Sequence, residues 1–159
     1  AIEHGADELD FVINYQAYKK GKKEEVKNEF LQCTALCLKN HKIAKWIIEI
    51  AALSDDEIAD ITADISRWAK EKFDALDLKN IFVKSSTGFY VTENGKPNGA
   101  TVSGITIMLN HAGELPVKAA GGVRTPQEAI DMINRGVKRI GTSSAKALIG
   151  DTATLDSGY

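Results

Sequence analysis

Five short apolar segments rich in β-branched residues alternate along the chain with longer segments of helical character. They run from Leu9 to Asn14, Ala44 to Ala51, Asn80 to Ser85, Leu115 to Ala120 and Arg139 to Ser143. Short apolar runs bounded by turn residues are typical of buried strands. Because helical segments separate these runs, the sequence predicts an α/β fold with five parallel strands joined by helical crossovers.

The first two intervals carry strong helix signals. From Lys23 to Lys39 an apolar residue recurs at helical spacing, at Val26, Phe30, Cys33 and Cys37. The second helix is expected to begin at Ser54, because Ser54 and Glu57 have the spacing of a capping box. Its apolar face comprises Ile58, Ile61, Ile65 and Trp68. On this pattern both cysteines are predicted to face the core rather than to bind a metal or act in redox chemistry.

Three more helices are predicted in the second half of the chain. One runs from about Thr101 to His111. The next begins with the capping box of Thr125 and Glu128, has a proline at its first helical position, and ends near Gly136. A short last helix is expected from about Ser144 to Gly150.

The two ends of the chain depart from this alternation. Residues Ile2 to Glu8 resemble the last turn of a helix that is closed by Gly5 and continues into a strand. Since the chain also begins at Ala1 rather than at methionine, we expect a preceding segment to have been removed. At the other end, Asp151 to Tyr159 is polar and is predicted to be a flexible tail. Residues 1–150 form the single predicted domain.

The composition is that of an ordinary globular domain. The 159 residues include 20 Lys and Arg against 22 Asp and Glu, for a net charge of −2. This balance argues against nucleic-acid and polybasic membrane partners. No apolar run approaches the ~20 residues needed to span a bilayer. With two cysteines expected to be free thiols, a cytoplasmic protein is predicted.

Three charged residues interrupt the predicted strands. Lys84 and Lys118 come near the carboxyl ends of two neighbouring strands, and Asp10 lies within the first. A charge inside a buried strand is costly unless it is paired or has a function, and this end of a parallel sheet is where α/β active sites lie. The simpler interpretation is that each lysine reaches solvent or pairs with a carboxylate.

Two neighbouring lysines have a chemical consequence. Each disfavours the charge of the other, so that one amine can be neutral and can add to a carbonyl to form an imine. The iminium accepts electrons and permits carbon–carbon cleavage without a metal. Lys45 is a possible third positive charge, although a solvated lysine or a partner for Glu49 explains it equally well.

Glycine and serine residues follow the last strands. Gly121 and Gly122 precede Arg124 and a capped helix, and Ser143 and Ser144 open the last helix. Glycine-rich turns and helix N-termini favour anions, and barrels often bind phosphate after their last two strands. The residues that follow Lys84, from Ser85 to Gly88, extend this polar edge or form a simple turn. We find no metal-ligand spacing and no nucleotide-binding motif, so no cofactor is predicted.

Two architectures fit the alternation of strands and helices. One is a doubly wound open sheet of five strands. The other is part of a (β/α)₈ barrel, because such barrels take ~250 residues and five of eight units would take about 156.

The chain resembles the deoxyribose-phosphate aldolase family along essentially its whole length. The similar blocks are residues 5–12 (GADELDFV), 45–49 (KWIIE), 82–88 (FVKSSTG), 117–125 (VKAAGGVRT), 140–144 (IGTSS) and the terminal Tyr159. The resemblance implies a (β/α)₈ TIM barrel, of which this chain would supply strands 4–8. It also implies reversible cleavage of 2-deoxy-D-ribose 5-phosphate to D-glyceraldehyde 3-phosphate and acetaldehyde in deoxyribonucleotide catabolism, without a cofactor.

The resemblance also implies roles for individual residues. Lys84 would form the Schiff base, Lys118 would lower the pKa of Lys84, and Asp10 would relay protons through water. Lys45 would support the site, and Tyr159 would assist proton transfer at the enamine carbon. The phosphate would contact Thr87, Gly88, Gly121, Gly122, Arg124, Ser143 and Ser144.

The chain is shorter than a complete barrel of this family. Three βα units would be missing, and two strand edges would then lack partners. We therefore expect a homo-oligomer or a complementing chain, and weak activity, because catalytic groups must be held to within about 0.5 Å. The alternatives are an inactive half-barrel that self-associates and a different phosphate-binding barrel enzyme, such as a sugar-phosphate isomerase or another lysine aldolase.

Overall fold

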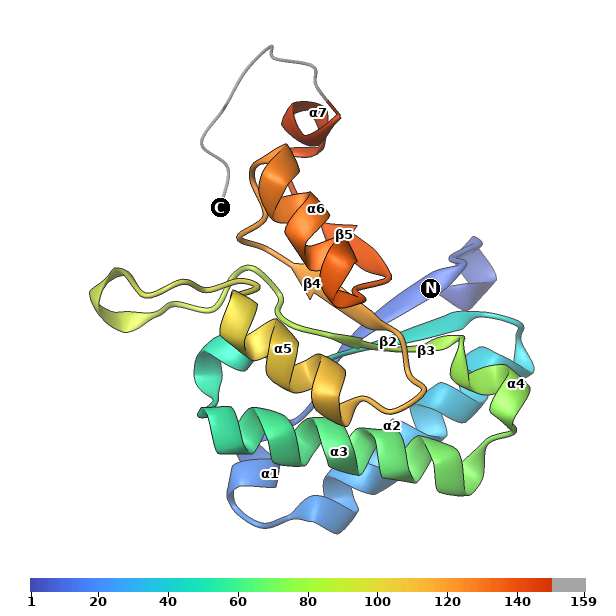
Figure 1. Ribbon diagram of the computed structural model, residues 1–159. Coiled ribbons are helices and arrows are strands. Elements are labelled where there is room, and N and C mark those ends of the chain that lie inside the picture. Colours follow the sequence, from blue (N-terminus) through green and yellow to red (C-terminus); the bar gives the residue numbers. More distant parts are fainter. Residues whose placement is uncertain (150–159) are drawn as a thin grey trace.

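A computed structural model describes residues 1–149 of the chain (Figure 1). Five strands alternate with the main helices. The strands are β1 (Glu8–Val12), β2 (Ile43–Ile47), β3 (Ile81–Lys84), β4 (Val117–Ala120) and β5 (Arg139–Gly141). The helices are α1 (Tyr15–Lys19), α2 (Lys23–Lys39), α3 (Asp55–Lys72), α4 (Ala75–Leu78), α5 (Val102–His111), α6 (Pro126–Arg135) and α7 (Ala145–Leu148). Short 3₁₀ turns occupy Ile2–His4, Ile50–Ala52 and Glu93–Gly95.

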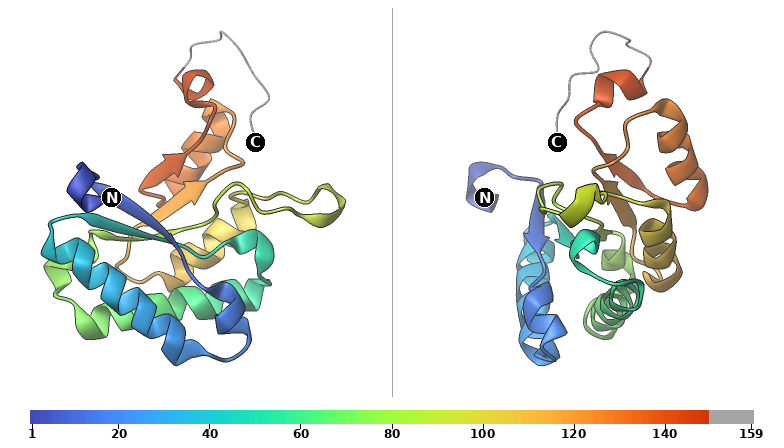
Figure 2. Two further views of the ribbon diagram at one scale, coloured as in Figure 1. Left: turned by 180° about the vertical axis from the view of Figure 1, so that it is seen from behind. Right: turned by 90° about the vertical axis from the view of Figure 1, so that its left-hand side faces the viewer.

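The five strands form one parallel sheet in the order β1-β2-β3-β4-β5. Each strand pairs with the next one along the chain, and the order never reverses. A doubly wound sheet requires such a reversal at its switch point, so that alternative is wrong. A right-handed crossover repeated in one direction places the helices on one face of the sheet, as Figures 1 and 2 show for α2, α3, α5 and α6.

The core lies between that face of the sheet and the helices. Trp46 of β2 is 1% exposed and packs against Phe30 of α2, with ring centroids 5.1 Å apart. Its indole Nε1 donates to the buried Thr34 Oγ1 at 2.9 Å. Phe30 also contacts Trp68 of α3, with centroids 6.0 Å apart. This aromatic row fastens α2 and α3 to the centre of the sheet.

The helix predictions are confirmed closely. Helix α2 spans Lys23–Lys39, and both predicted capping boxes are formed, at Ser54 with Glu57 and at Thr125 with Glu128. The predicted apolar face of α3 is buried. Cys37 is buried and Cys33 is partly buried against the core, as predicted for free thiols. Gly5 closes the first turn with a left-handed backbone, φ 84°.

Several strand limits were predicted wrongly. The second strand ends at Ile47 rather than Ala51, because Glu49 has φ 60° and the chain turns there into a 3₁₀ helix. The first strand ends at Val12, and the fifth ends at Gly141. The short helices α1 and α4 were not predicted, because segments of five and four residues offer too few positions for a helical period to be visible.

An ion pair between the two outer strands shows how strongly the sheet is curved. In a flat sheet the strands β1 and β5 would lie about 19 Å apart, at about 4.8 Å per strand. The guanidinium of Arg139 on β5 nevertheless donates to the carboxylate of Glu8 on β1. The sheet therefore curls so that side chains from its two edges meet across the face that the helices leave open.

A polar clamp joins the first helices to α3. Asp64 of α3 accepts from the hydroxyl of Tyr18 at 2.6 Å and from Lys23 Nζ at 2.9 Å, and it also pairs with Arg67. Burial raises the pKa of Asp64, but the hydrogen bonds from Lys23, Tyr18 and Arg67 outweigh burial and lower it. Burial and the bond to Asp64 raise the pKa of Tyr18 to about 12.

Asp64→Asn should destabilise the fold in a pH-dependent way. Because the folded pKa of Asp64 lies below its unfolded value, the clamp stabilises above the ordinary carboxyl pKa, and this contribution is lost as the pH falls through the folded pKa. We expect a loss of about 1–3 kcal/mol at pH 7 and little difference near pH 2, measured by urea unfolding. Asp60→Asn, on an exposed position of α3, is the control. Equal losses at both pH values would contradict the prediction.

None of the helices within residues 1–149 is long and apolar enough to cross a membrane.

Candidate active site

Charged side chains alternate with buried apolar ones along the strands. The strand register places Glu8, Asp10, Lys45, Lys84, Lys118 and Arg139 on the face opposite the helices. We call these six residues the concave-face cluster. Successive residues of a strand point to opposite faces, so the same strands fill the core with Trp46, Val83 and Val117 on the other side. The charges that looked costly in the sequence therefore lie together on one face.

Asp10 is the centre of the cluster. Its Oδ2 accepts from Lys84 Nζ at 2.9 Å, and its Oδ1 lies 3.1 Å from Lys45 Nζ. Burial raises the pKa of Asp10, but the hydrogen bonds from Lys84 and Lys45 outweigh burial and lower it. Asp10 is therefore an anion that holds two ammonium groups, and each carboxylate oxygen serves one of them.

The position of Lys45 in the structure agrees with neither explanation that the sequence offered. It is in the middle of β2, is only 7% exposed, and pairs with Asp10 and with Glu8 Oε2 at 3.2 Å. It is thus neither solvated nor a partner of Glu49. The reason is the alternation along the strand, which places Lys45 on the concave face beside Asp10 in register.

Lys84 and Lys118 are register partners on the adjacent strands β3 and β4. Lys84 ends its strand, as predicted, whereas Lys118 is the second residue of β4. Among the described residues Lys118 makes no ion pair with a carboxylate. Its pKa is lowered by burial and by the positive charges of Lys45 and Lys84. One paired and one unpaired amine thus lie side by side.

A pocket of about 400 Å³ opens above the two lysines. Lys84 and Lys118 line its floor. The loops that follow β3, β4 and β5 form its walls, with residues 87–89, 98, 120–124 and 141–144. Small phosphorylated metabolites fit a cavity of this size, which lies in the 300–1,000 Å³ range of ligand sites.

The loop after β4 forms one wall of the pocket, and some of its backbone N–H groups have no hydrogen-bond acceptor among the described residues. Gly121 and Gly122 both have left-handed backbones, with φ 72° and 77°. The N–H groups of Gly122 and Val123 have no acceptor within residues 1–149, and the same is true of Gly88 across the pocket. At Gly122 a side chain would also meet the carbonyl oxygen of Ala100 at 3.0 Å. Glycine is needed there, and the free amides can bind an anion.

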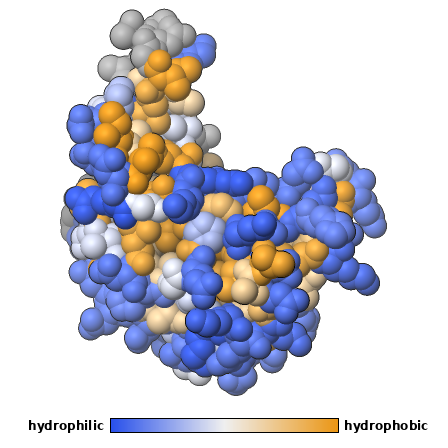
Figure 3. Space-filling view, turned by 45° about the vertical axis from the view of Figure 1, so that its right-hand side comes forward, coloured by the Kyte–Doolittle hydropathy of each residue, from blue (hydrophilic) through white to orange (hydrophobic). Residues whose placement is uncertain are grey.

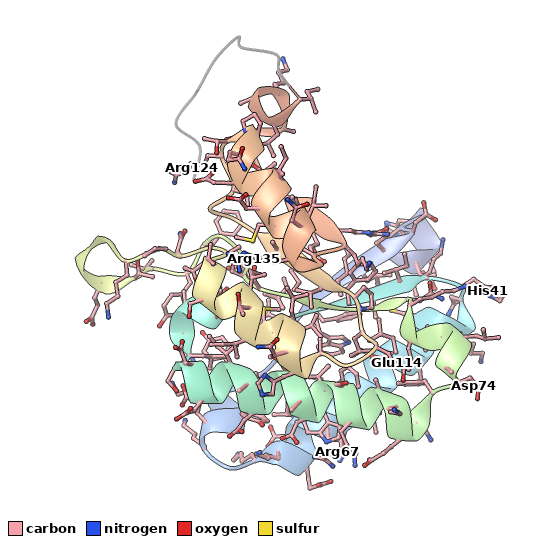
Figure 4. The ribbon with its side chains drawn as sticks, viewed as in Figure 1. His41, Arg67, Asp74, Glu114, Arg124 and Arg135 are labelled. Carbon is pink, nitrogen blue, oxygen red and sulfur yellow. The ribbon has the colours of Figure 1, made fainter. Side chains whose placement is uncertain are left out.

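All seven predicted phosphate residues line this pocket, namely Thr87, Gly88, Gly121, Gly122, Arg124, Ser143 and Ser144. The N–H groups of Gly88 and Gly122 have no acceptor among residues 1–149, whereas the Gly121 N–H donates to the carbonyl of Gly141 at 3.0 Å. Figure 4 places Arg124 in the turn that leads into α6. The N–H and O–H groups of Thr87 both donate to Glu49. Tyr159 lies outside the described residues.

The sequence indicated Ser85 and Ser86 as part of the polar edge without showing what they contact, and it did not single out Thr142 or Asn98. The hydroxyls of Ser85 and Ser86 both donate to the carbonyl of Ala120, at 3.2 and 2.6 Å, and Ser85 Oγ accepts from the Ala120 N–H. These bonds continue the pairing of β3 with β4 beyond the strands. Thr142 Oγ1 donates to the carbonyl of Val123 and accepts from the Ser144 N–H. The Asn98 side-chain amide donates to the carbonyl of Gly88. Such contacts join distant loops and leave no local pattern.

Within residues 1–149 no group of three or more His, Cys, Asp or Glu side chains is arranged to hold a metal ion.

Together, the fold and the site define a class of protein. The class comprises parallel α/β proteins that hold a lysine pair and a carboxylate on the strands, below a glycine-lined pocket for an anion.

The chain has many relatives of known name. No protein-family model matches it. It is 39% identical over 150 residues to the deoxyribose-phosphate aldolase of Thermococcus kodakarensis, which covers 94% of this chain and 60% of the relative. It is 38% identical over 158 residues to that of Mycoplasma pneumoniae, which covers 99% and 62%. The chain thus spans about three fifths of the length of these relatives.

Solved structures agree with the sequence comparison. The solved structure "QR15, an Aldolase" superimposes with a TM-score of 0.74 at 32% identity, over 92% of this chain and 59% of that one. A deoxyribose phosphate aldolase from Aeropyrum pernix, described as tetrameric, superimposes with a TM-score of 0.69 at 27% identity, over 93% and 56%. Over nearly its whole length, this chain is therefore similar to proteins named deoxyribose-phosphate aldolase.

Proposed function

We propose that this protein is a class I aldolase that reversibly cleaves 2-deoxy-D-ribose 5-phosphate to D-glyceraldehyde 3-phosphate and acetaldehyde. The observation that carries the proposal is the pair of amines, Lys84 and Lys118, on the floor of a pocket with free amides in its wall. The names of the relatives support it. The reaction would take place inside the cell as part of deoxyribonucleotide breakdown.

The first chemical half forms an imine. The Lys84 amine adds to the aldehyde carbon C1 of the open-chain sugar, and the resulting carbinolamine loses water. Lys118, with its lowered pKa, is the group suited to take up the proton that Lys84 must lose. Asp10, which contacts Lys84, would relay protons through water to the leaving hydroxyl.

The second half breaks the bond between C2 and C3. The C3 hydroxyl gives up its proton through the same relay, C3 becomes the aldehyde of glyceraldehyde 3-phosphate, and the bonding electrons move into the iminium to form an enamine. Protonation of the enamine at C2, with Tyr159 proposed to assist, and hydrolysis release acetaldehyde and the free lysine. Every proton and electron pair is returned, so no external oxidant or metal takes part in this scheme.

The substrate phosphate would occupy the wall of the pocket opposite the lysines. The N–H groups of Gly88, Gly122 and Val123 and the side chains of Arg124, Ser143 and Ser144 are proposed to bind it. Lys45 would support the site by sharing Asp10 and Glu8 with its neighbours.

We also propose that the barrel is completed by further chain. The sheet, as part of a (β/α)₈ barrel, would correspond to strands 4–8, and β1 and β5 are its outer strands. Apolar side chains are exposed on α6, with Ile130 at 48% and Ile133 at 58%, and Figure 3 shows apolar surface over this end of the molecule. A homo-oligomer or a complementing chain would cover such surfaces.

The other functions that the sequence allowed have less support. A sugar-phosphate isomerase would not need the adjacent lysines, and the relatives described above are named aldolases. An inactive half-barrel would not need an intact pocket above the lysine pair.

Trapping the imine tests the proposal directly. Incubation with acetaldehyde and borohydride should leave an ethyl group on Lys84, located by peptide mass spectrometry. The exposed Lys79 is the internal control and should stay unmodified under the same conditions. A folded sample without an adduct would refute the proposal for this protein, and an adduct on Lys118 alone would reverse the roles of the two lysines.

A further inference from the structure

A buried carboxylate that the proposed mechanism does not use lies behind the phosphate wall. Glu49 follows β2, is 3% exposed, and makes no ion pair with any described residue. Its backbone is left-handed, with φ 60° and ψ 64°. Burial without a cation and a left-handed backbone are both unfavourable for glutamate, and such features persist where the surroundings require them.

Within residues 1–149, all hydrogen bonds to the Glu49 side chain come from one residue of the next loop. Glu49 Oε2 accepts from Thr87 Oγ1 at 2.5 Å and from the Thr87 N–H at 3.2 Å. The segment is also joined through its backbone, because the Ile50 N–H donates to the carbonyl of Ser85 at 2.9 Å. The loop after β2 therefore holds the loop after β3 at two points.

This contact determines the shape of the turn at Gly88. With its proton donated to Glu49, Thr87 Oγ1 accepts from the Phe89 N–H at 3.1 Å, on the far side of Gly88. Gly88 itself is left-handed, at φ 85°, and its carbonyl accepts from Asn98 at 3.1 Å. The turn is thus held on both sides, while the Gly88 N–H stays without an acceptor among the described residues.

Glu49 does this without reaching the pocket. The residues that line the pocket include Thr87 and Gly88 but not Glu49. Thr87 lines the pocket, and its two donors face the Glu49 side chain. In this position Glu49 can organise an anion site without contacting the anion.

We propose that Glu49 is a positioning residue for the phosphate end of the site, acting through Thr87 to hold the Gly88 amide ready for the anion. The proposal rests on the proposed function, because it assigns the pocket to a phosphate. It predicts that Glu49 governs affinity for phosphate and for phosphorylated substrate, and leaves imine formation on Lys84 unchanged.

The test measures binding of inorganic phosphate to the full chain by calorimetry or ³¹P NMR. Glu49→Gly removes the carboxylate and at the same time suits the left-handed backbone, so that it should fold; we expect phosphate affinity to fall roughly tenfold or more. Thr87→Val should give a similar loss, Thr87→Ser should restore binding, and the double variant should be no worse than either single one. Thr34→Val, which removes a buried hydroxyl elsewhere, is the control.

Two readouts separate this inference from the aldolase proposal. Acetaldehyde trapping on Lys84 reports on the aldolase chemistry, and phosphate affinity reports on Glu49. A Glu49-dependent affinity supports the inference even in a protein that forms no imine. Unchanged affinity in Glu49→Gly, or a wild-type chain that binds no phosphate, overturns it even where the imine forms. In an active protein, KM for 2-deoxyribose 5-phosphate should rise in Glu49→Gly, whereas the reaction with unphosphorylated 2-deoxyribose should not change.

Discussion

Lys84→Arg should abolish imine formation and lower turnover of 2-deoxyribose 5-phosphate by at least about 10³-fold, a loss typical of removing a covalent nucleophile. Arginine keeps the positive charge and can still donate to Asp10, which Lys84 contacts at 2.9 Å. Its guanidinium stays protonated and does not add to carbonyls. The variant therefore removes the nucleophile while the concave-face cluster keeps its charge balance.

Steady-state cleavage and borohydride trapping are the measurements, with thermal unfolding as the check on folding. Lys79→Arg makes the same chemical change at an exposed position and should leave both rates unchanged. If Lys84→Arg retained trapping at the wild-type rate, another amine would be the nucleophile. Lys118, whose pKa is lowered by burial and neighbouring charge, would then be the first to examine.

Gly99→Ala is expected to damage stability and anion binding together. A Cβ atom at this position would lie 2.5 Å from the carbonyl carbon of Gly121 and 2.8 Å from the Gly122 nitrogen. Both neighbours are backbone atoms, so the two loops would have to separate. The Ala100 N–H, which donates to the carbonyls of Ala120 and Gly121 at 3.0 Å, would lose these acceptors.

We expect Gly99→Ala to cost about 2–3 kcal/mol of unfolding free energy, as in other overpacked sites, and to weaken phosphate binding. Urea unfolding and phosphate titration measure the two effects. Ser103→Ala, at an exposed position of the following helix α5, is the control and should change neither. Wild-type stability in Gly99→Ala would mean that the loops after β3 and β4 are not in this close contact.

Local signals explain why the helices were predictable. Both partners of a capping box, such as Ser54 and Glu57, lie within one helical turn. The buried residues of α3 recur at the helical period, which is visible in the sequence. The end of the strand that contains Lys45 was harder to predict. It depends on Glu49, whose left-handed backbone is stabilised by Thr87, and Thr87 lies 38 residues further along the chain.

The candidate site also combines residues that the sequence indicated with contacts that it did not. Lys84, Lys118 and Asp10 were visible because a charge in an apolar strand is costly wherever the strand goes. Their partners were not visible. Strand register determines that Asp10 contacts both Lys84 and Lys45. The curvature of the sheet determines which carboxylates lie near Lys118, which pairs with none of those in the described part of the chain.

Local sequence patterns were enough to predict the alternation of strands and helices, the helix boundaries with capping boxes, and the candidate residues for an imine and a phosphate. Each of these depends on neighbours within one or two turns of chain. The strand order, the curvature that brings Arg139 to Glu8, and the contact of Glu49 with Thr87 became visible only in the folded structure. These features depend on the register and packing of segments far apart in the chain. The interaction energies between such segments cannot be read from a local sequence pattern.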